Sequence, residues 1–180
     1  LPAIGQGTGD VSLPLERAFD SVLMFQGIES KFVYAADVLY HELAHAVVGS
    51  SSKLSGGYKD DYGTHLTPGS LNEGFADYAA LTITENPTLG RYVTIAGGSG
   101  IRELSTAKAC PTHLTGEVHD DGEPWASSLW AFRQQLDEAE RSAFDGAVLT
   151  AMATMSGRNA GYDTAANTVI EETELALGED

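Results

Sequence analysis

The segment His41-Glu42-Leu43-Ala44-His45 carries two histidines four residues apart, with a glutamate directly after the first. On an α-helix, positions i and i+4 lie on one face, one turn apart, so both imidazoles can reach the same Zn²⁺. Glu42 then lies beside them, where it can act as a base towards a water at that metal. The pattern predicts a metal-dependent hydrolase with His41 and His45 as zinc ligands and Glu42 as a catalytic residue. The alternative is an exposed helix that carries two histidines by coincidence.

The residues around this motif favour a mostly buried helix. Largely apolar and helix-favouring residues flank it at 35–40 and 46–48. Buried imidazoles and a buried carboxylate need partners, and one metal ion supplies a partner to all three. We therefore predict the metal-binding helix over about residues 35–50.

A third ligand must come from elsewhere, because a catalytic zinc usually takes three protein ligands and leaves a fourth position for water. The best candidate is Glu73, on a second predicted helix that starts at residues 68–70 and ends near Glu85. Asp77 shares a face with Glu73, so its carboxylate can accept the remaining N–H of a ligand histidine. Asn72 either fixes the other histidine or belongs to the helix start. The alternative is that Glu73 and Asp77 are ordinary solvent-facing acids.

Together these blocks resemble the signature of the gluzincins, the thermolysin-like metallopeptidases. The long interval between His45 and Glu73 is closer to the fungalysin branch. Residues 116–130, which read Gly-Glu-Val-His-Asp-Asp-Gly-Glu-Pro-Trp-Ala-Ser-Ser-Leu-Trp, are similar to a third block of that family. By this resemblance, His119 faces the zinc across the cleft and donates a hydrogen bond to the oxyanion of the tetrahedral intermediate. A fixed donor at that place would lower the barrier on physical grounds as well. The alternative is a surface-loop histidine among acids.

The resemblance implies a zinc endopeptidase that acts on proteins or peptides and is secreted or otherwise extracytoplasmic. Tyr58 and Tyr62 are the candidates for a transition-state tyrosine. Two family features are missing. The Asn-Ala-aromatic strand motif that aligns the substrate does not occur in residues 1–34, and Leu114 and Thr115 stand where an Asp usually precedes the cleft histidine. The alternatives are a zinc aminopeptidase and, outside the enzymes, a catalytically silent zinc-binding module.

The chain has 180 residues and a formal net charge of −16. This length predicts a single metallopeptidase catalytic domain over residues 1–180. The start at Leu1, without Met or a signal-like stretch, predicts a processed piece whose β-rich N-terminal part is trimmed or reduced, and an N-terminal prosegment is a candidate partner. The charge argues against nucleic acid or an anionic membrane as a partner, and no apolar run approaches the length of a membrane span.

Acidic clusters make Ca²⁺ a second candidate cofactor, because hard cations prefer several oxygen ligands. The clusters lie at residues 60–61, 117–123 and 171–174, and a solvated acidic surface is the other explanation. The single cysteine, Cys110, cannot form an internal disulfide, and we expect it to be a small buried side chain.

The apolar periodicity predicts a mainly α fold with little or reduced β-sheet. The family resemblance implies that this fold is a zincin-like catalytic helical domain. In addition to the two helices above, we expect helices over residues 16–25, 123–139, 140–155 and 164–177 and one short strand near 92–95. The spacing of Trp125, Leu129 and Phe132 predicts core contacts.

Overall fold

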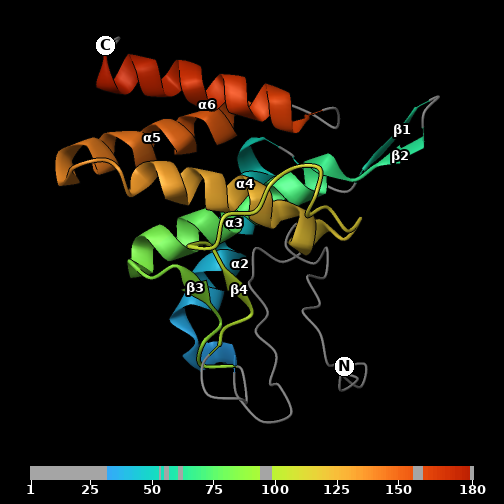
Figure 1. Ribbon diagram of the computed structural model, residues 1–180, viewed down its shortest axis with the longest axis horizontal. Helices are drawn as coiled ribbons and strands as arrows, with labels where there is room; N and C mark the ends of the chain where they lie inside the picture. Colours follow the sequence, from blue (N-terminus) through green and yellow to red (C-terminus); the bar gives the residue numbers. More distant parts are fainter. Residues whose placement is uncertain are drawn as a thin grey trace.

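The computed structural model describes residues 32–52, 54, 57–60, 63–93, 99–155 and 160–178 (Figure 1). In chain order these residues form η1 (Phe32–Tyr34), α2 (Ala36–Ser51), β1 (Tyr58–Asp60), β2 (Gly63–His65), α3 (Thr67–Thr84), β3 (Thr88–Leu89), β4 (Arg102–Glu103), α4 (Val118–Arg133), α5 (Glu138–Thr154) and α6 (Tyr162–Leu177). Within them the fold is mainly α, as predicted, with two small antiparallel sheets, β1–β2 and β3–β4. The helix expected at 16–25 lies outside the described residues. No helix in the described part is long and apolar enough to cross a membrane.

The helix α3 forms the centre of the molecule, with α2 packed on one side and α4 on the other (Figure 1). The helices α5 and α6 form a second packed pair beyond α4. Because α3 is covered on both sides, most of its side chains are buried, including the charged residues Glu73 and Asp77. Helices buried in this way show apolar or small residues on every face, not a single apolar stripe.

Two groups of buried apolar side chains hold the helices together. The larger group joins α2, α3, α4, α5 and α6 and includes Val48, Leu71, Phe75, Tyr78, Trp125, Leu129, Phe144, Val148 and Val169. The smaller group lies between α3, α4 and the β3–β4 sheet and consists of Ala80, Leu81, Leu89, Leu104, Ala126 and Trp130. Trp125 and Leu129 are core residues as predicted, whereas Phe132 is 41% exposed.

The prediction that α2 is mostly buried was wrong. Its buried residues, Val38, His41, His45 and Val48, follow a spacing of three and four and form one face. On the opposite side Val47 is 47% exposed. The physical reason is that, among the described helices, α2 lies at the outer end of the stack and packs mainly on α3 (Figure 1). Both histidines nevertheless lie on the buried face.

The helix α4 begins five residues earlier than the sequence predicted. We expected its start at about residue 123. The structure instead begins at Val118, because the side chain of Glu117 accepts the backbone N–H groups of His119 and Asp120 and so caps the helix. His119 therefore lies in the first turn of α4 and not in a loop.

The irregular segment between α3 and α4 differs from the prediction at two places. Tyr92 and Val93 belong to a turn after β3, so the strand expected at 92–95 does not include them, and residues 94 and 95 lie outside the described part. The short strands lie instead at 88–89 and 102–103, and their pairing aligns Leu89 with Arg102.

Cys110 is exposed, so the prediction of a buried cysteine was wrong. The cysteine belongs to the stretch from residue 105 to 117, whose side chains are exposed or half-buried and contribute nothing to either apolar group. A small apolar residue type favours burial only where the chain passes through the core, and here the chain runs over the surface.

Candidate metal centre

The two histidines of α2 point at the same place. His41 and His45 lie one turn apart on the buried face and are 1% and 4% exposed. Their Nε2 atoms are 3.0 Å apart, and the rings meet edge to face with centroids separated by 4.5 Å. Two ring nitrogens turned towards each other in this way leave one position between them for a shared cation.

Glu73 reaches this position from α3. Its Oε2 lies 3.3 Å from Nε2 of His41 and 3.4 Å from Nε2 of His45, and the residue is 6% exposed. Among the described residues, these three form the only group of histidine, cysteine or carboxylate side chains whose ligand atoms all lie within 4.8 Å of one another. The α2–α3 packing therefore gathers two nitrogens and one oxygen at a single point.

The donor set fits a zinc ion on two independent grounds. Tetrahedral zinc with ligand bonds of roughly 2.0–2.1 Å separates neighbouring ligand atoms by about 3.3 Å. The three observed separations are 3.0, 3.3 and 3.4 Å. Moreover, Glu73 Oε2 is buried and accepts no hydrogen bond. A buried carboxylate oxygen in that state is costly unless a cation compensates it.

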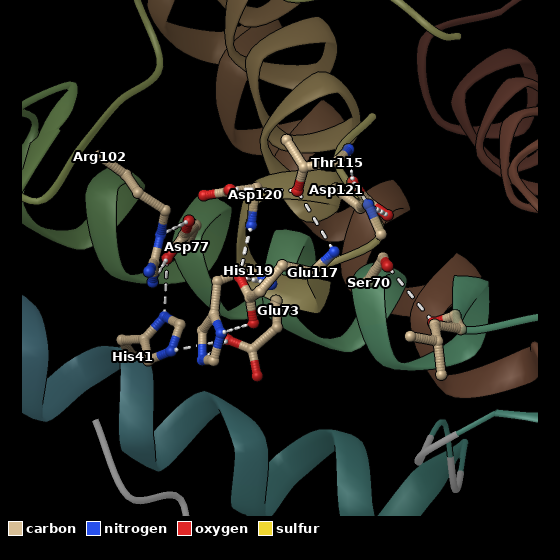
Figure 2. A network of polar contacts seen from close by, with 12 residues as sticks. His41, Ser70, Glu73, Asp77, Arg102, Thr115, Glu117, His119, Asp120 and Asp121 are labelled. Atoms are coloured by element: carbon tan, nitrogen blue, oxygen red, sulfur yellow. Dashed lines mark hydrogen bonds and ion pairs between the residues drawn. The ribbon is translucent and has the colours of Figure 1, made fainter. Parts of the chain in front are cut away.

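A buried ion pair supports His41 from the side away from Glu73. Nδ1 of His41 lies 2.8 Å from Oδ1 of Asp77. Asp77 in turn accepts two hydrogen bonds from Arg102, at 2.6 Å from Nε and 2.8 Å from Nη2 (Figure 2). Asp77 is fully buried and Arg102 is 8% exposed. This arrangement fixes the ring so that Nε2 faces Glu73.

His45 has a different support. Its Nδ1 lies 2.8 Å from Oδ1 of Asn72, and Nδ2 of Asn72 donates a hydrogen bond of 2.8 Å to the carbonyl oxygen of Leu54. The second contact settles the orientation of the amide, so its oxygen faces the ring, and Nδ1 of His45 is the donor. Of the two roles expected for Asn72, the structure therefore gives it the contact with the histidine.

The electrostatics of the cluster favour a cation at this place. Burial alone would lower the pKa of His41, but the contacts of its ring with the carboxylates of Asp77 and Glu73 outweigh burial and raise that pKa to about 10. Burial would raise the pKa of Glu73, yet its contacts with His41 and His45 hold that pKa below its usual range. The two buried carboxylates thus stay ionised and draw positive charge towards the imidazoles, either as protons or as a metal ion.

His119 approaches the same carboxylate from α4. Its Nε2 lies 3.5 Å from Oε2 of Glu73, and its Nδ1 lies 2.6 Å from Oε1 of Glu117. Figure 2 shows His41, Glu73 and His119 converging from three different helices. The histidine predicted to face the metal is therefore beside the candidate ligands.

The remaining predicted site residues are less fully described. Glu42 is half-buried on α2, directly after His41. Tyr58 belongs to β1, but its side chain is not among those that the structure describes, and Tyr62 lies outside the described residues.

A cavity of about 500 Å³ opens beside the candidate metal centre. The cavity is lined by five polar or charged residues, His41, Arg102, Glu117, His119 and Asp120, and by five apolar residues, Phe32, Val38, Leu89, Val93 and Ile101. A cavity with an apolar wall and a few convergent polar groups is the usual form of a small binding site.

Sequence reasoning gave no role to Arg102, and it included Glu117 only as an acid near His119 and as part of the acidic cluster at residues 117–123. Arg102 is an isolated cation in an irregular stretch, so no spacing rule connects it with Asp77. Glu117 was visible as an acid two residues before His119, but its bond to the ring depends on the helix start at Val118, which the sequence placed later.

Comparison with known families agrees with this geometry. A model of the fungalysin metallopeptidase family (M36) matches residues 26–174, which include the candidate metal centre and all the described helices except the last three residues of α6. No curated protein and no solved structure matches the chain in the corresponding comparisons. A match over most of the chain shows the family, and the chain therefore belongs to the fungalysin metallopeptidases (M36), a family of zinc-dependent proteases.

Proposed function

We propose that this protein is a zinc endopeptidase in which His41, His45 and Glu73 hold the metal, while Glu42 and His119 act on the substrate. The observation that carries the proposal is the convergence of three ligand atoms from two helices, with a buried Glu73 oxygen that accepts no hydrogen bond. Asp77 and Asn72 would hold the two histidine ligands in orientation.

When bound, zinc would polarise the scissile carbonyl and lower the pKa of a water molecule. Glu42 would accept a proton from that water as it attacks the carbonyl carbon, and would later pass the proton to the leaving amine. His119 would donate a hydrogen bond from Nε2 to the carbonyl oxygen as negative charge develops there. Loss of one such donor typically reduces kcat by about 10²–10³-fold.

The cavity beside the centre supports a peptide substrate. The apolar residues of its lining, which include Val38, Leu89 and Ile101, would contact an apolar side chain next to the scissile bond. Because the chain belongs to this family, the proposal also includes secretion of the protein and an N-terminal prosegment as its partner. Calcium stays a prediction for the acidic clusters at 117–123 and 171–174, whereas the carboxylates of residues 60 and 61 are not described.

The test is a comparison of the wild-type chain with Glu42→Gln, each assayed for bound zinc and for cleavage of a peptide blocked at both ends. We expect one zinc per chain in both proteins and a kcat lower by at least about 10²–10⁴-fold in the variant, because Gln cannot accept the proton. The companion variant Glu73→Ala should instead lose the zinc. Wild-type turnover by Glu42→Gln would remove the general-base role.

The same assay, run also with a peptide that has a free α-amino group, separates the endopeptidase from the two alternative functions. Cleavage that requires a free α-amino group on the peptide would favour a zinc aminopeptidase over an endopeptidase. Stoichiometric zinc without cleavage of either peptide would favour a catalytically silent zinc-binding module.

A further inference from the structure

The carboxylate of Glu117 makes two different kinds of contact at the start of α4. Oε2 accepts the backbone N–H groups of His119 and Asp120, at 3.0 and 3.1 Å, and so caps the helix. Oε1 lies 2.6 Å from Nδ1 of the His119 ring. One side chain therefore holds both the backbone and the ring of the same histidine.

The backbone around Glu117 is itself held in place. The backbone N–H groups of Thr115 and Gly116 donate to the carboxylate of Asp121, at 2.6 and 3.2 Å, and Thr115 Oγ1 accepts the N–H of Glu117 at 3.2 Å. Gly116 has a φ of +86°, a conformation that favours glycine. These contacts give Glu117 a defined position before α4, although its side chain is 53% exposed.

The contact with Glu117 determines which ring nitrogen faces the candidate metal centre. Because Nδ1 is turned to Glu117, Nε2 is turned to Oε2 of Glu73, at 3.5 Å (Figure 2). A ring without this anchor could rotate about its side-chain torsions and move Nε2 away from the reacting carbonyl. A displacement of about 1 Å in such a group can cost about 10²-fold in rate.

We propose that Glu117 is a positioning residue for the hydrolysis: its carboxylate holds the His119 ring so that Nε2 donates to the developing oxyanion. The inference rests on the proposed function, since it gives Glu117 a role only if His119 acts on the substrate. Glu117 also lines the cavity, but its contact with the reaction is through the histidine.

Three substitutions separate the ring contact from the helix cap. Glu117→Asp keeps a good N-cap residue but shortens the side chain by one methylene, so the carboxylate no longer reaches Nδ1. Glu117→Gln removes the charge and leaves one acceptor oxygen, which can serve the helix cap or the ring but not both. Glu117→Ala removes both contacts. The control is Asp137→Ala, which removes the cap of α5 far from the candidate centre.

The measurements are kcat, KM, bound zinc and melting temperature for each full-length variant. We expect kcat to fall by about 10- to 100-fold in Glu117→Asp and Glu117→Ala, and by less in Glu117→Gln, at nearly constant KM and zinc content. Melting temperature should fall in Glu117→Ala and Asp137→Ala and stay at the wild-type value in Glu117→Asp. If Glu117 served the helix alone, Glu117→Asp would keep the wild-type kcat, and the proposal would be wrong.

A double-mutant cycle with His119→Ala decides whether the effect passes through the ring. We expect Glu117→Asp to cause no further loss of kcat when His119 is already replaced. An additional loss of the same size in the double variant would overturn the proposal. If His119→Ala alone kept the wild-type kcat, the proposed role of His119 would fail first. A loss in His119→Ala with full activity in Glu117→Asp would overturn this inference alone.

Discussion

Gly74 on α3 and Gly122 on α4 bring the backbones of the two helices into direct contact. A Cβ at Gly122 would lie 2.8 Å from the carbonyl oxygen of Ser70, 2.9 Å from the backbone nitrogen of Gly74 and 3.1 Å from Cβ of Glu73. Contacts this short with rigid backbone leave no room for a methyl group. The close crossing carries His119, one turn before Gly122, to within 3.5 Å of Glu73.

We predict that Gly122→Ala separates α3 from α4 and disturbs the candidate metal centre. The clash should lower the free energy of unfolding by about 1–3 kcal/mol and reduce kcat/KM. The control is Gly146→Ala on α5, where an added Cβ meets nothing within 4 Å. That variant should be more stable by up to about 1 kcal/mol, with unchanged activity, because alanine is the better helix former. Denaturant unfolding and peptide hydrolysis measure both effects. Full activity and stability in Gly122→Ala would contradict the packing argument.

Removing the support of His41 should weaken zinc binding. The Arg102 guanidinium and the His41 ring overcome the effect of burial and lower the pKa of Asp77 to about 2, so the carboxylate is ionised at neutral pH. We expect Asp77→Asn to reduce zinc affinity by about 10- to 100-fold, because the amide is a weaker acceptor for the ring N–H. Competition with a chromogenic chelator measures the dissociation constant. Glu103→Gln, next to Arg102 on β4, is the control and should leave zinc affinity unchanged. An unaltered dissociation constant in Asp77→Asn would show that the ring needs no such support.

The cavity wall should determine which side chain the enzyme accepts. Ile101 is 48% exposed and is one of the apolar residues that line the cavity. We predict that Ile101→Ala lowers kcat/KM by about 10-fold or more for peptides with a large apolar residue next to the scissile bond, and much less for peptides with alanine there. Ile83→Ala on α3, an exposed isoleucine that does not line the cavity, is the control. An equal loss for both kinds of peptide would assign Ile101 to stability and not to substrate choice.

Arg133 should matter for stability and not for catalysis. It is 4% exposed, and its guanidinium donates to Asp145 of α5 at 3.0 Å and to Glu85, after the end of α3, at 2.7 Å. Asp145 also accepts the hydroxyl of Tyr78. Arg133→Met leaves these acids without their cation, so we expect the free energy of unfolding to fall by about 1–3 kcal/mol. Because Glu85 is largely exposed, solvent screens its share of this loss. Zinc content and kcat should not change, and a loss of either would place Arg133 in the functional site.

The sequence by itself determined the parts of the site that lie within one helix. The two residues of each pair, His41–His45 and Glu73–Asp77, are four positions apart in the sequence. An α-helix places such residues on one face, whatever the rest of the chain does. Helical periodicity also predicted the mainly α fold and the extents of α2, α5 and α6 to within about two residues, the usual error of helix ends.

Only the tertiary structure decided which residues from different elements meet. The packing of α2 on α3 brings Glu73 to the histidines, the β3–β4 pairing brings Arg102 to Asp77, and the start of α4 at Val118 brings Glu117 to the ring of His119. Packing between elements also determines that Cys110 and one side of α2 are exposed. Local periodicity fixes the face of a helix on which a side chain lies, but contacts between helices depend on packing and loop geometry, which no short stretch of sequence contains.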